Sequence, residues 1–332
     1  MGDLPEVSVV VASYNRRLRL PALVEAVLAD EAASELIVVV DGCDDGSIEF
    51  LQQVAADEPR LRPIRVSHRG HLACLDAGVR MASSRVVLLL DDDVLPHEGL
   101  VSSHAAWHCA KSGLVVMGYM PVRLPKHRRH GDVGTYVYAG EYEMHCSRIE
   151  RGELAVLDGL WAGNVSMSRE VCLAVGLQSE KFPLFYHSDM DLGLRLKAAG
   201  LEGVFSRSLV ASHLHERSTA AFLRDAIAQG AGDALVHQVH ESEIGSFDPT
   251  RMYADLPAPL RVVVFALGSS RHAGSACRLL TALAGLFGRL HWFSAETAVA
   301  KLARRVLQLH GAPGAVPHEG KRRIAFSKRS SS

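Results

Sequence analysis

The sequence has little net charge, few aromatic residues and no long hydrophobic run. Its 332 residues carry 36 Lys and Arg against 37 Asp and Glu, so the formal net charge is −1 at pH 7. The longest apolar segments, residues 86–90 and 262–268, are far shorter than the roughly 20 residues that a membrane helix needs. The N-terminal segment 1–5 lacks the basic and apolar regions of a signal peptide. We therefore expect a cytoplasmic protein without a membrane-spanning helix.

Cysteine and glycine patterns disfavour several kinds of site. The six cysteines form no CxxC pair and no zinc-like spacing, so we expect reduced thiols. The glycine-containing loop at residues 41–47 lacks the GxGxxG of a dinucleotide site and the GxxxxGK(S/T) of a P-loop. Those two nucleotide-binding folds are therefore disfavoured.

Charge is distributed unevenly along the chain. Residues 1–216 carry 21 basic and 29 acidic side chains, a net charge of −8, whereas residues 217–332 carry 15 and 8, a net charge of +7. The basic excess is concentrated at residues 258–332, with 12 basic and 2 acidic side chains. The length suits one domain of about 200–250 residues with an appendage.

Strand and helix patterns alternate in the first part of the chain. The spacing predicts strands at residues 7–11, 36–40, 64–66 and 85–90, and helices at 18–28, 48–56 and 72–81. Such alternation favours a mainly parallel α/β sheet covered on both faces. Ligands of these sheets lie beyond the carboxyl ends of the strands, where the polar clusters of this sequence stand.

The later part of the chain has a mixed and then a helical pattern. We expect strands at 114–119, 154–157 and 204–210, a basic loop at 126–132, and helices at 189–199, 219–229, 273–290 and 295–309. The predicted division is a catalytic domain at 1–216, with a nucleotide-binding half at about 1–93 and an acceptor half at 94–216. A helical extension at 217–310 and a disordered basic tail at 311–332 follow.

Three consecutive aspartates, Asp91, Asp92 and Asp93, follow the apolar run at residues 86–90. Alternation along a strand places Asp91 and Asp93 on one side and Asp92 on the other. Two converging carboxylates suit Mg²⁺ or Mn²⁺, which keep open positions for diphosphate oxygens. A solvated acidic turn is the alternative, but adjacent like charges repel one another without a cation. The pattern predicts a metal site at Asp91 and Asp93.

Three further positions carry candidate chemistry. Asp41 ends the strand at 36–40, where its carboxylate is suited to accept from a base N–H or a ribose hydroxyl. Asp189 starts a helix, whose dipole keeps a general base ionised, although an N-cap role is the alternative. His213 and His215 share one face of an extended segment, as a metal ligand or as ordinary loop histidines.

Taken together, these motifs resemble the inverting glycosyltransferases of family 2, which have the GT-A fold. The matching segments are 9–16 (VVVASYNR), 38–42 (VVVDG), 45–47 (DGS), 69–70 (RG), 77–78 (AG), 88–93 (LLLDDD), 163–166 (GNVS), 189–195 (DMDLGLR) and His213. They follow the family's order across roughly residues 6–215. The resemblance implies a Rossmann-like GT-A sheet with a C-terminal helical extension. It also implies a metal-dependent inverting hexosyltransferase that uses a nucleoside-diphosphate sugar, most commonly a UDP-sugar.

The resemblance implies roles for individual residues. The implied donor-binding residues are Ala12, Tyr14, Asp41, Arg69, Asp91, Asp92, Gly163 and Asn164. Asp93 and Asp91, a DxD-type motif, would hold Mn²⁺ or Mg²⁺ on the diphosphate. His213 is similar to a histidine that some members use as a further metal ligand, with His215 as the alternative. Asp189 would be the general base that deprotonates the acceptor.

Two positions depart from the family pattern. Ser188 stands where the family usually has a glutamate before the base, which removes one acceptor-orienting carboxylate. Leu75 and Asp76 stand where the family's helix usually carries Arg-Asn, which bears on nucleotide contacts. The first departure leaves a catalytically inactive nucleotide-sugar-binding module as an alternative function.

Other functions and partners follow from weaker patterns. A sugar nucleotidyltransferase is the second alternative, disfavoured because residues 12–15 replace the Gly-rich basic loop that such enzymes need. Residues 271–305 combine an apolar stripe with basic residues. This pattern is typical of a helix on an anionic membrane surface, or of a helical lid or dimer face. The acceptor, whether glycan, lipid, peptide or small natural product, is not identified. We expect no nucleic-acid partner, because the basic residues of the tail are not interleaved with a series of aromatic residues.

Overall fold

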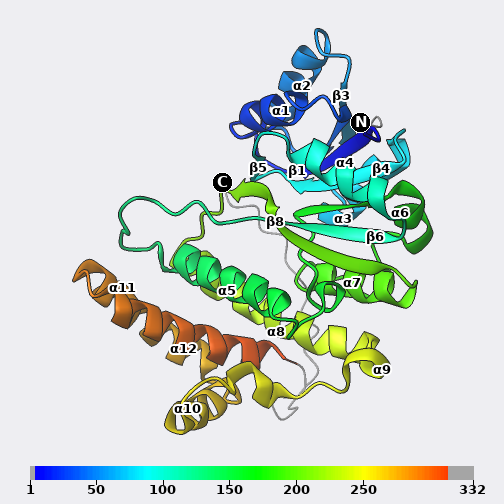
Figure 1. The fold of residues 1–332 in the computed structure, drawn as a ribbon. Coiled ribbons are helices and arrows are strands. Elements are labelled where there is room, and N and C mark those ends of the chain that lie inside the picture. Colours follow the sequence, from blue (N-terminus) through cyan, green and yellow to red (C-terminus); the bar gives the residue numbers. More distant parts are fainter. Residues whose placement is uncertain (1–3, 313–332) are drawn as a thin grey trace.

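An eight-stranded sheet forms the centre of the molecule (Figure 1), and the structure, a computed structural model, describes residues 4–312. The strands are β1 (Val7–Ser13), β2 (Ala33–Asp41), β3 (Leu61–Val66), β4 (Val86–Asp91), β5 (Val94–Pro96), β6 (Leu114–Tyr119), β7 (Asn164–Ser168) and β8 (Glu202–His213). Their order is β3-β2-β1-β4-β7-β6-β8-β5. The first four strands in this order pair in parallel, as do β6 and β8, whereas β7 and β5 are antiparallel to their neighbours. The predicted mostly parallel α/β sheet is confirmed.

Helices cover both faces of the sheet because its strands are apolar on both sides. Along β1, Val9 and Val11 belong to one core and Val10 to the other, as the alternation of a strand requires. The first core receives side chains from α1 (Leu20–Leu28), α2 (Ser47–Ala55), α4 (Leu100–Ala110) and α5 (Val133–Glu150). The second receives them from α3 (His71–Met81), α6 (Arg169–Val175) and α7 (Ser188–Ala198).

A third apolar core joins α5 to the C-terminal helices, which lie below the sheet in Figure 1. The C-terminal helices are α8 (Thr219–Val239), α9 (Glu241–Ile244), α10 (Ala258–Gly268), α11 (Ala273–Arg289) and α12 (Phe293–Gly311), of which α9 packs on a separate small cluster instead. Val133 and Val137 of α5 are buried with Phe222 of α8 and Val306 of α12. Helix α5 therefore contributes to a sheet core and to the core of the extension, while the division at residue 216 stays a prediction.

All three predicted C-terminal helices are present, and the structure adds two that were not predicted, α9 and α10. The helices predicted at 273–290 and 295–309 correspond to α11 and α12, and the one predicted at 219–229 continues to Val239. The apolar run at 262–268 belongs to α10. None of the helices described between residues 4 and 312 is both long and apolar enough to cross a bilayer. The predicted basic tail lies outside the described residues, apart from 311 and 312.

One predicted strand is wrong. Residues 154–157 form no strand, and Val156–Gly159 is a single 3₁₀ turn. The backbone of Leu157 in this turn approaches Gly193 of α7 so closely that a Cβ there would lie 2.2 Å from its carbonyl oxygen. A four-residue apolar run suits such a buried turn as well as a strand, so periodicity could not separate the two.

Candidate functional site

Polar residues from three neighbouring strands meet at the carboxyl edge of the sheet. Asp41 ends β2, Asp91 ends β4, and Tyr14 follows β1. In the sheet register Ala12 pairs with Asp91 on one side and with Val39 on the other, so the three strand ends are side by side. This edge is where open α/β sheets bind their ligands.

Asp41 is nearly buried and holds the loop that leads into α3. Its carboxylate accepts hydrogen bonds from the backbone N–H groups of Arg69 at 2.7 Å and Gly70 at 3.0 Å. Nδ1 of His68 lies 2.9 Å from the same carboxylate. Burial raises the pKa of Asp41, but the backbone donors, the thiol of Cys74 and His68 together outweigh burial and leave the pKa below its usual value. Asp41 is therefore an ionised acceptor at this edge.

Two aromatic rings stand beside Asp41. The ring of Tyr14, which is 47% exposed, lies 5.0 Å from that of His68 between centroids. Arg69 contacts Asp41 through its backbone, while its guanidinium reaches Ser67 Oγ at 3.4 Å. The two rings are tilted by 41° to each other, and the exposed ring of Tyr14 offers a face on which a nucleobase could stack.

The three consecutive aspartates do not alternate as a continuing strand would. Strand β4 ends at Asp91, and Asp92 and Asp93 lie in the turn before β5. Arg16 contacts both turn residues, at 3.4 Å from Asp92 and 3.5 Å from Asp93. Asp91 lies instead 3.4 Å from Nε2 of His71. The turn ends the strand alternation, yet burial and then the charges of Asp91 and Asp93 raise the pKa of the Tyr138 hydroxyl, so a shared side for these two carboxylates stays a prediction.

The two turn aspartates have opposite pKa shifts. Burial raises the pKa of Asp92 to about 6, although the charge of Arg16 opposes it. Burial also acts on Asp93, but His213 and the charges of Arg16 and Arg19 outweigh it and lower its pKa to about 2. Asp93 is therefore ionised under any ordinary condition.

His213 contacts Asp93 and is nearly buried. Its Nε2 lies 3.3 Å from the carboxylate, and the backbone N–H of Leu214 donates to the carbonyl of Asp93 at 2.7 Å. The ring of His215 stacks on Tyr138, with centroids 4.0 Å apart, and burial lowers its pKa to about 4. Of the two histidines that the sequence left open, His213 is the one beside the carboxylate.

Asp189 lies in the first turn of α7, which begins at Ser188. Its carboxylate accepts from the backbone N–H of Ala162 at 3.2 Å, so it does not cap its own helix. Burial and then the charge of Asp91 raise the pKa of Asp189 to about 6. Such a group is largely ionised at neutral pH and is more basic than an ordinary aspartate, as a general base should be.

Gly163 and Asn164 have different surroundings. A Cβ on Gly163 would lie 2.5 Å from Oδ2 of Asp91, so glycine leaves room for that carboxylate. Asn164 is fully buried, its amide donates to the carbonyl of Leu209 at 3.1 Å, and its Oδ1 lies 3.0 Å from Nε2 of His104. Asn164 pairs with the residue before Asp91, near the carboxyl end of β4, but its side chain is buried and hydrogen-bonded within the core.

Asp93 and His213 have the donor chemistry for a divalent cation. A carboxylate oxygen and an imidazole nitrogen suit Mn²⁺, and one or two carboxylates with substrate phosphates suit Mg²⁺. In the part of the chain that the structure describes, no group of three or more His, Cys, Asp or Glu side chains is arranged to hold a metal. A cation at Asp93 and His213 would therefore have two protein ligands, with its other positions left for phosphate oxygens and water. The residues present fit such an ion.

Three residues of this edge were not selected from the sequence. Arg16 follows β1, His68 follows β3, and His71 is the first residue of α3. A usable signal was present, because each stands a few residues beyond the carboxyl end of a parallel strand. Arg16 ends the matched segment 9–16 without an assigned role, whereas His68 and His71 lie outside every matched segment.

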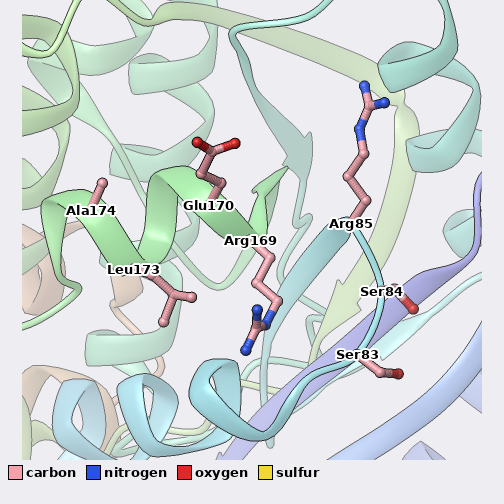
Figure 2. Close-up of a pocket in the computed structure, with 7 residues that line it drawn as sticks. All are labelled: Ser83, Ser84, Arg85, Arg169, Glu170, Leu173 and Ala174. Atoms are coloured by element: carbon pink, nitrogen blue, oxygen red, sulfur yellow. The ribbon is translucent and has the colours of Figure 1, made fainter.

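A separate cavity lies at the opposite end of β4 (Figure 2) and has a volume of about 550 Å³. Its lining residues are Ser83, Ser84, Arg85, Arg169, Glu170, Leu173 and Ala174. The side chains of Arg85 and Arg169 point away from each other in Figure 2. The guanidinium of Arg169 donates to the carbonyls of Val79 at 3.1 Å and Arg80 at 3.0 Å, so it connects α6 to α3. The side chain of Arg169 in this cavity therefore has a structural role.

Comparison with known proteins gives matches in sequence. A family model described as "Glycosyltransferase like family 2" matches residues 5–232. The uncharacterised glycosyltransferase YfnE of Bacillus subtilis (strain 168) is 22% identical over 271 residues, which cover 66% of this chain and 67% of that protein. An undecaprenyl-phosphate 4-deoxy-4-formamido-L-arabinose transferase of Pectobacterium atrosepticum is 35% identical over 100 residues, which cover 28% of this chain and 31% of that protein. The chain thus matches less than a third of the second relative's length.

The fold also matches a solved structure. The mannosyltransferase PcManGT from Pyrobaculum calidifontis, in complex with GDP-Man and Mn²⁺, superposes with a TM-score of 0.56 at 16% sequence identity. The match covers 92% of this chain and 88% of that one. It confirms the predicted GT-A fold class, including the helices that follow the sheet.

Proposed function

The chain belongs to glycosyltransferase family 2, and from this premise we propose that it transfers a sugar from a nucleoside-diphosphate sugar to an acceptor hydroxyl with inversion. The observation that supports the proposal is that the charges of Asp93 and Asp189 both act on Tyr138, while the pKa of Asp189 is raised and that of Asp93 is lowered. Inverting transfer needs a base for the acceptor and charge stabilisation for the leaving group. These two carboxyls have the protonation behaviour that the two tasks require.

Asp189 is proposed as the general base. The acceptor oxygen forms a bond to the anomeric carbon while the bond from that carbon to the diphosphate oxygen breaks. Asp189 takes the proton of the acceptor hydroxyl, and the nucleoside diphosphate leaves. The backbone N–H of Ala162 holds the carboxylate in place at 3.2 Å, which favours one orientation of the base.

Asp93 and His213 are proposed to hold Mn²⁺ or Mg²⁺. When bound, such an ion neutralises negative charge on the leaving diphosphate. Arg16 and Arg19 lie 3.5 and 3.9 Å from Asp93 and keep its carboxylate ionised before any ion binds. Asp91, which contacts His71, is proposed to contact the donor ribose rather than the ion.

The base and ribose of the donor are proposed to bind at Asp41, Tyr14 and His68. A flat base would stack on the exposed ring of Tyr14, whose centroid lies 5.0 Å from that of His68. We propose a UDP-sugar, the commonest donor of the family, with GDP-sugars as the competing class because PcManGT is described with GDP-Man. The acceptor is left as a hydroxyl-bearing molecule at this stage.

A donor screen tests the proposed reaction. The melting temperature would be measured with Mn²⁺ and each of several UDP-sugars and GDP-sugars, because a ligand that binds the folded state stabilises it by mass action. We expect one sugar nucleotide to raise the melting temperature in a Mn²⁺-dependent way and to release its nucleoside diphosphate. Consumption of a nucleoside triphosphate with a sugar phosphate would instead indicate a nucleotidyltransferase. Binding without any release under a broad acceptor panel would indicate an inactive binding module.

We also propose that the protein works at the cytoplasmic face of a membrane, which it contacts through α10 and α11. The buried side of α11 consists of small residues: Ala273, Cys277, Ala284 and Gly288. The opposite side carries exposed leucines: Leu279 (71% exposed), Leu283 (37%), Leu286 (48%) and Leu290 (64%). Their spacing of four, three and four residues places these leucines on one helix face. Val262 and Phe265 of α10 are 68% and 58% exposed.

Charge around this face suits an anionic lipid surface. Arg271, Arg278 and Arg289 are exposed at or next to α11. Within residues 258–312 the single carboxylate side chain is that of Glu296, which is buried and paired with Arg128. Apolar residues with cationic neighbours bind anionic lipids, whereas two such faces would repel each other in a dimer.

Vesicle co-sedimentation tests the membrane contact. We expect the protein to sediment with phosphatidylglycerol vesicles and to remain in solution with phosphatidylcholine vesicles. Leu279→Glu with Leu286→Glu should abolish sedimentation, and Met81→Glu, at an exposed apolar position on α3, should not. The proposal is wrong if the double variant sediments like the original protein. It is also wrong if the original binds no vesicle and forms a dimer that the double variant dissociates.

A further inference from the structure

A cavity of about 1060 Å³ adjoins the Asp93–His213 pair. Its walls come from the start of α1, from the segment 123–135 and from the segment 214–221. The basic side chains and histidines that line it are Arg19, Arg123, Arg129, Arg217, His130 and His215. Asp132 and Glu216 are the two carboxylates in the lining, so four arginines face two acids. The cavity is therefore cationic.

One wall of the cavity is continuous with the Asp93–His213 pair. Nη1 of Arg19 lies 3.9 Å from the carboxylate of Asp93 and donates to the carbonyl of Leu214 at 2.6 Å. The backbone N–H of Arg123 donates to the carbonyl of His213 at 2.9 Å. A ligand in the cavity would therefore lie next to the proposed position of the donor diphosphate.

Another residue of the lining, Arg217, connects to the segment that leads into the helix of the proposed base. Nη2 of Arg217 donates to the hydroxyl of Tyr186 at 2.9 Å, and Arg217 also pairs with Asp225. Tyr186 lies two residues before Ser188, the first residue of α7, and Asp189 follows directly. The cavity thus extends from the Asp93–His213 pair toward the segment that leads to Asp189. An acceptor must lie close to this base.

Two of the four arginines are available for a ligand. Within residues 4–312, the side chains of Arg123 and Arg129 form no ion pair and no hydrogen bond, and both are exposed. The carboxylate of Asp132 accepts from the backbone N–H of Arg129 at 2.9 Å, and the side chain of Glu216 is 88% exposed. The acids of the lining therefore do not neutralise these two guanidinium groups.

We propose that this cavity binds a phosphate group of the acceptor, so that the acceptor is a phosphorylated molecule. The proposal rests on the proposed glycosyl transfer. Guanidinium groups match phosphate oxygens with paired, charge-assisted hydrogen bonds and stay charged at every relevant pH. The volume of the cavity is that of a pocket for a whole small molecule. A diphosphate alone would fill only part of it. The phosphate belongs either to a lipid or to a soluble metabolite, and the binding experiment distinguishes the two. The proton that Asp189 takes is then that of the acid O–H of a lipid phosphate monoester, or that of an alcohol in a soluble phosphate.

Calorimetric titration without donor and without metal tests the site. The probes are citronellyl phosphate as a short lipid phosphate, glycerol 3-phosphate as a soluble one, and citronellol as the phosphate-free control. We expect at least one phosphate to bind and citronellol to bind far more weakly. Arg123→Ala combined with Arg129→Ala should raise the Kd about 10-fold or more, as the loss of charge-assisted hydrogen bonds implies. Arg148→Ala, at an exposed arginine of α5 outside the cavity, should leave the Kd unchanged.

Each outcome decides the question. Tighter binding of citronellyl phosphate supports a lipid acceptor, and equal or tighter binding of glycerol 3-phosphate supports a soluble one. The proposal is overturned if neither phosphate binds, if citronellol binds equally, or if the double variant binds like the original protein. It is also overturned if the double variant loses the thermal shift by sugar nucleotide and Mn²⁺, since the cavity would then serve the donor. Absence of that shift in the original protein would refute the proposed function independently.

Discussion

The imidazole of His213 lies 3.3 Å from the carboxylate of Asp93, and a strand pairing sets this distance. Strand β5 is antiparallel to the end of β8, with Val94 opposite His213 and Leu95 opposite Ser212. The residue that precedes Val94 therefore stands beside the imidazole. A three-residue edge strand thus joins the acidic turn to the histidine.

Removal of His213 should weaken metal binding. His213→Ala deletes one of the two proposed protein ligands, and even the loss of an outer-shell partner typically costs 10–100-fold in metal affinity. We expect a loss of at least 10-fold, measured by Mn²⁺ titration in the presence of the nucleoside diphosphate. His215→Ala should bind Mn²⁺ normally, because that ring stacks on Tyr138. Normal affinity in His213→Ala would exclude His213 as a ligand.

Removal of the proposed base should slow turnover without weakening donor binding. Asp189→Asn keeps the size of the side chain but cannot take a proton, so we expect turnover to fall by roughly 10²–10⁴. The thermal shift by the sugar nucleotide should stay the same. Asp57→Asn, at an exposed aspartate after α2, is the matched control and should have full activity. Near-normal turnover of Asp189→Asn would refute the base assignment.

A methyl group at Gly163 should disturb the site more than the fold. In Gly163→Ala the new Cβ would lie 2.5 Å from Oδ2 of Asp91, so the carboxylate must move. We expect at least about a 10-fold loss of activity, since small misplacements of site groups are costly. Gly140→Ala is the control, because no atom lies within 4 Å of the added Cβ in helix α5. Comparing kcat with the melting temperature separates the two effects, and full activity of Gly163→Ala would contradict the role of Asp91.

The sequence predicts the strand-end residues well because their signals are local. Asp41 and Asp91 each follow a buried apolar run, and parallel strands bring such ends to one edge. The direction of each side chain is less predictable. Asp92 and Asp93 both contact Arg16 because β4 ends at Asp91 and the two aspartates that follow lie in a turn.

Other site features depend on contacts between distant segments, which no local pattern encodes. His68 comes beside Asp41 because β3 pairs with β2, and its own sequence context is an ordinary loop. Asn164 fits a family motif, yet its amide is used by Leu209 and His104 after β7 pairs with its neighbours. Such residues can be assigned only when the strand order is known.

Stability at low pH should depend on Glu35 in β2. Burial raises its pKa, but hydrogen bonds from Ser8 and Ser83 and the nearby Arg62 outweigh burial and lower the pKa to about 2 from 4.5. A depressed pKa stabilises the fold above pH 4.5, by about 3 kcal/mol, and this stabilisation is lost as the pH falls toward 2.

Urea unfolding at several pH values measures this contribution. Glu35→Gln should be less stable than the original protein at pH 7, and the difference should shrink between about pH 4.5 and pH 3. Glu180→Gln, at an exposed loop position, should show no such dependence. A difference that stays constant over this range would show that the charge of Glu35 is not the stabilising factor.

The basic loop before α5 should depend on one buried ion pair. Nη2 of Arg128 lies 2.9 Å from the carboxylate of Glu296 in α12 and 2.9 Å from Oγ1 of Thr297, and Glu296 is 1% exposed. The guanidinium carbon also lies 4.9 Å from the ring centroids of Tyr136 and Phe293. The pair thus joins the loop that lines the cationic cavity to the C-terminal helices.

Loss of one partner should cost more than loss of both. Arg128→Met leaves a buried carboxylate without its guanidinium, and we expect the free energy of unfolding to fall by about 3–5 kcal/mol. Arg128→Met combined with Glu296→Leu removes both charges and should recover most of that loss, because an apolar pair of similar volume is often neutral. Arg278→Met, at an exposed position of α11, should change stability by less than about 0.5 kcal/mol. Urea unfolding compares the four proteins, and a double variant as unstable as Arg128→Met would mean that the packing of the Arg128 side chain, rather than its charge, holds the loop.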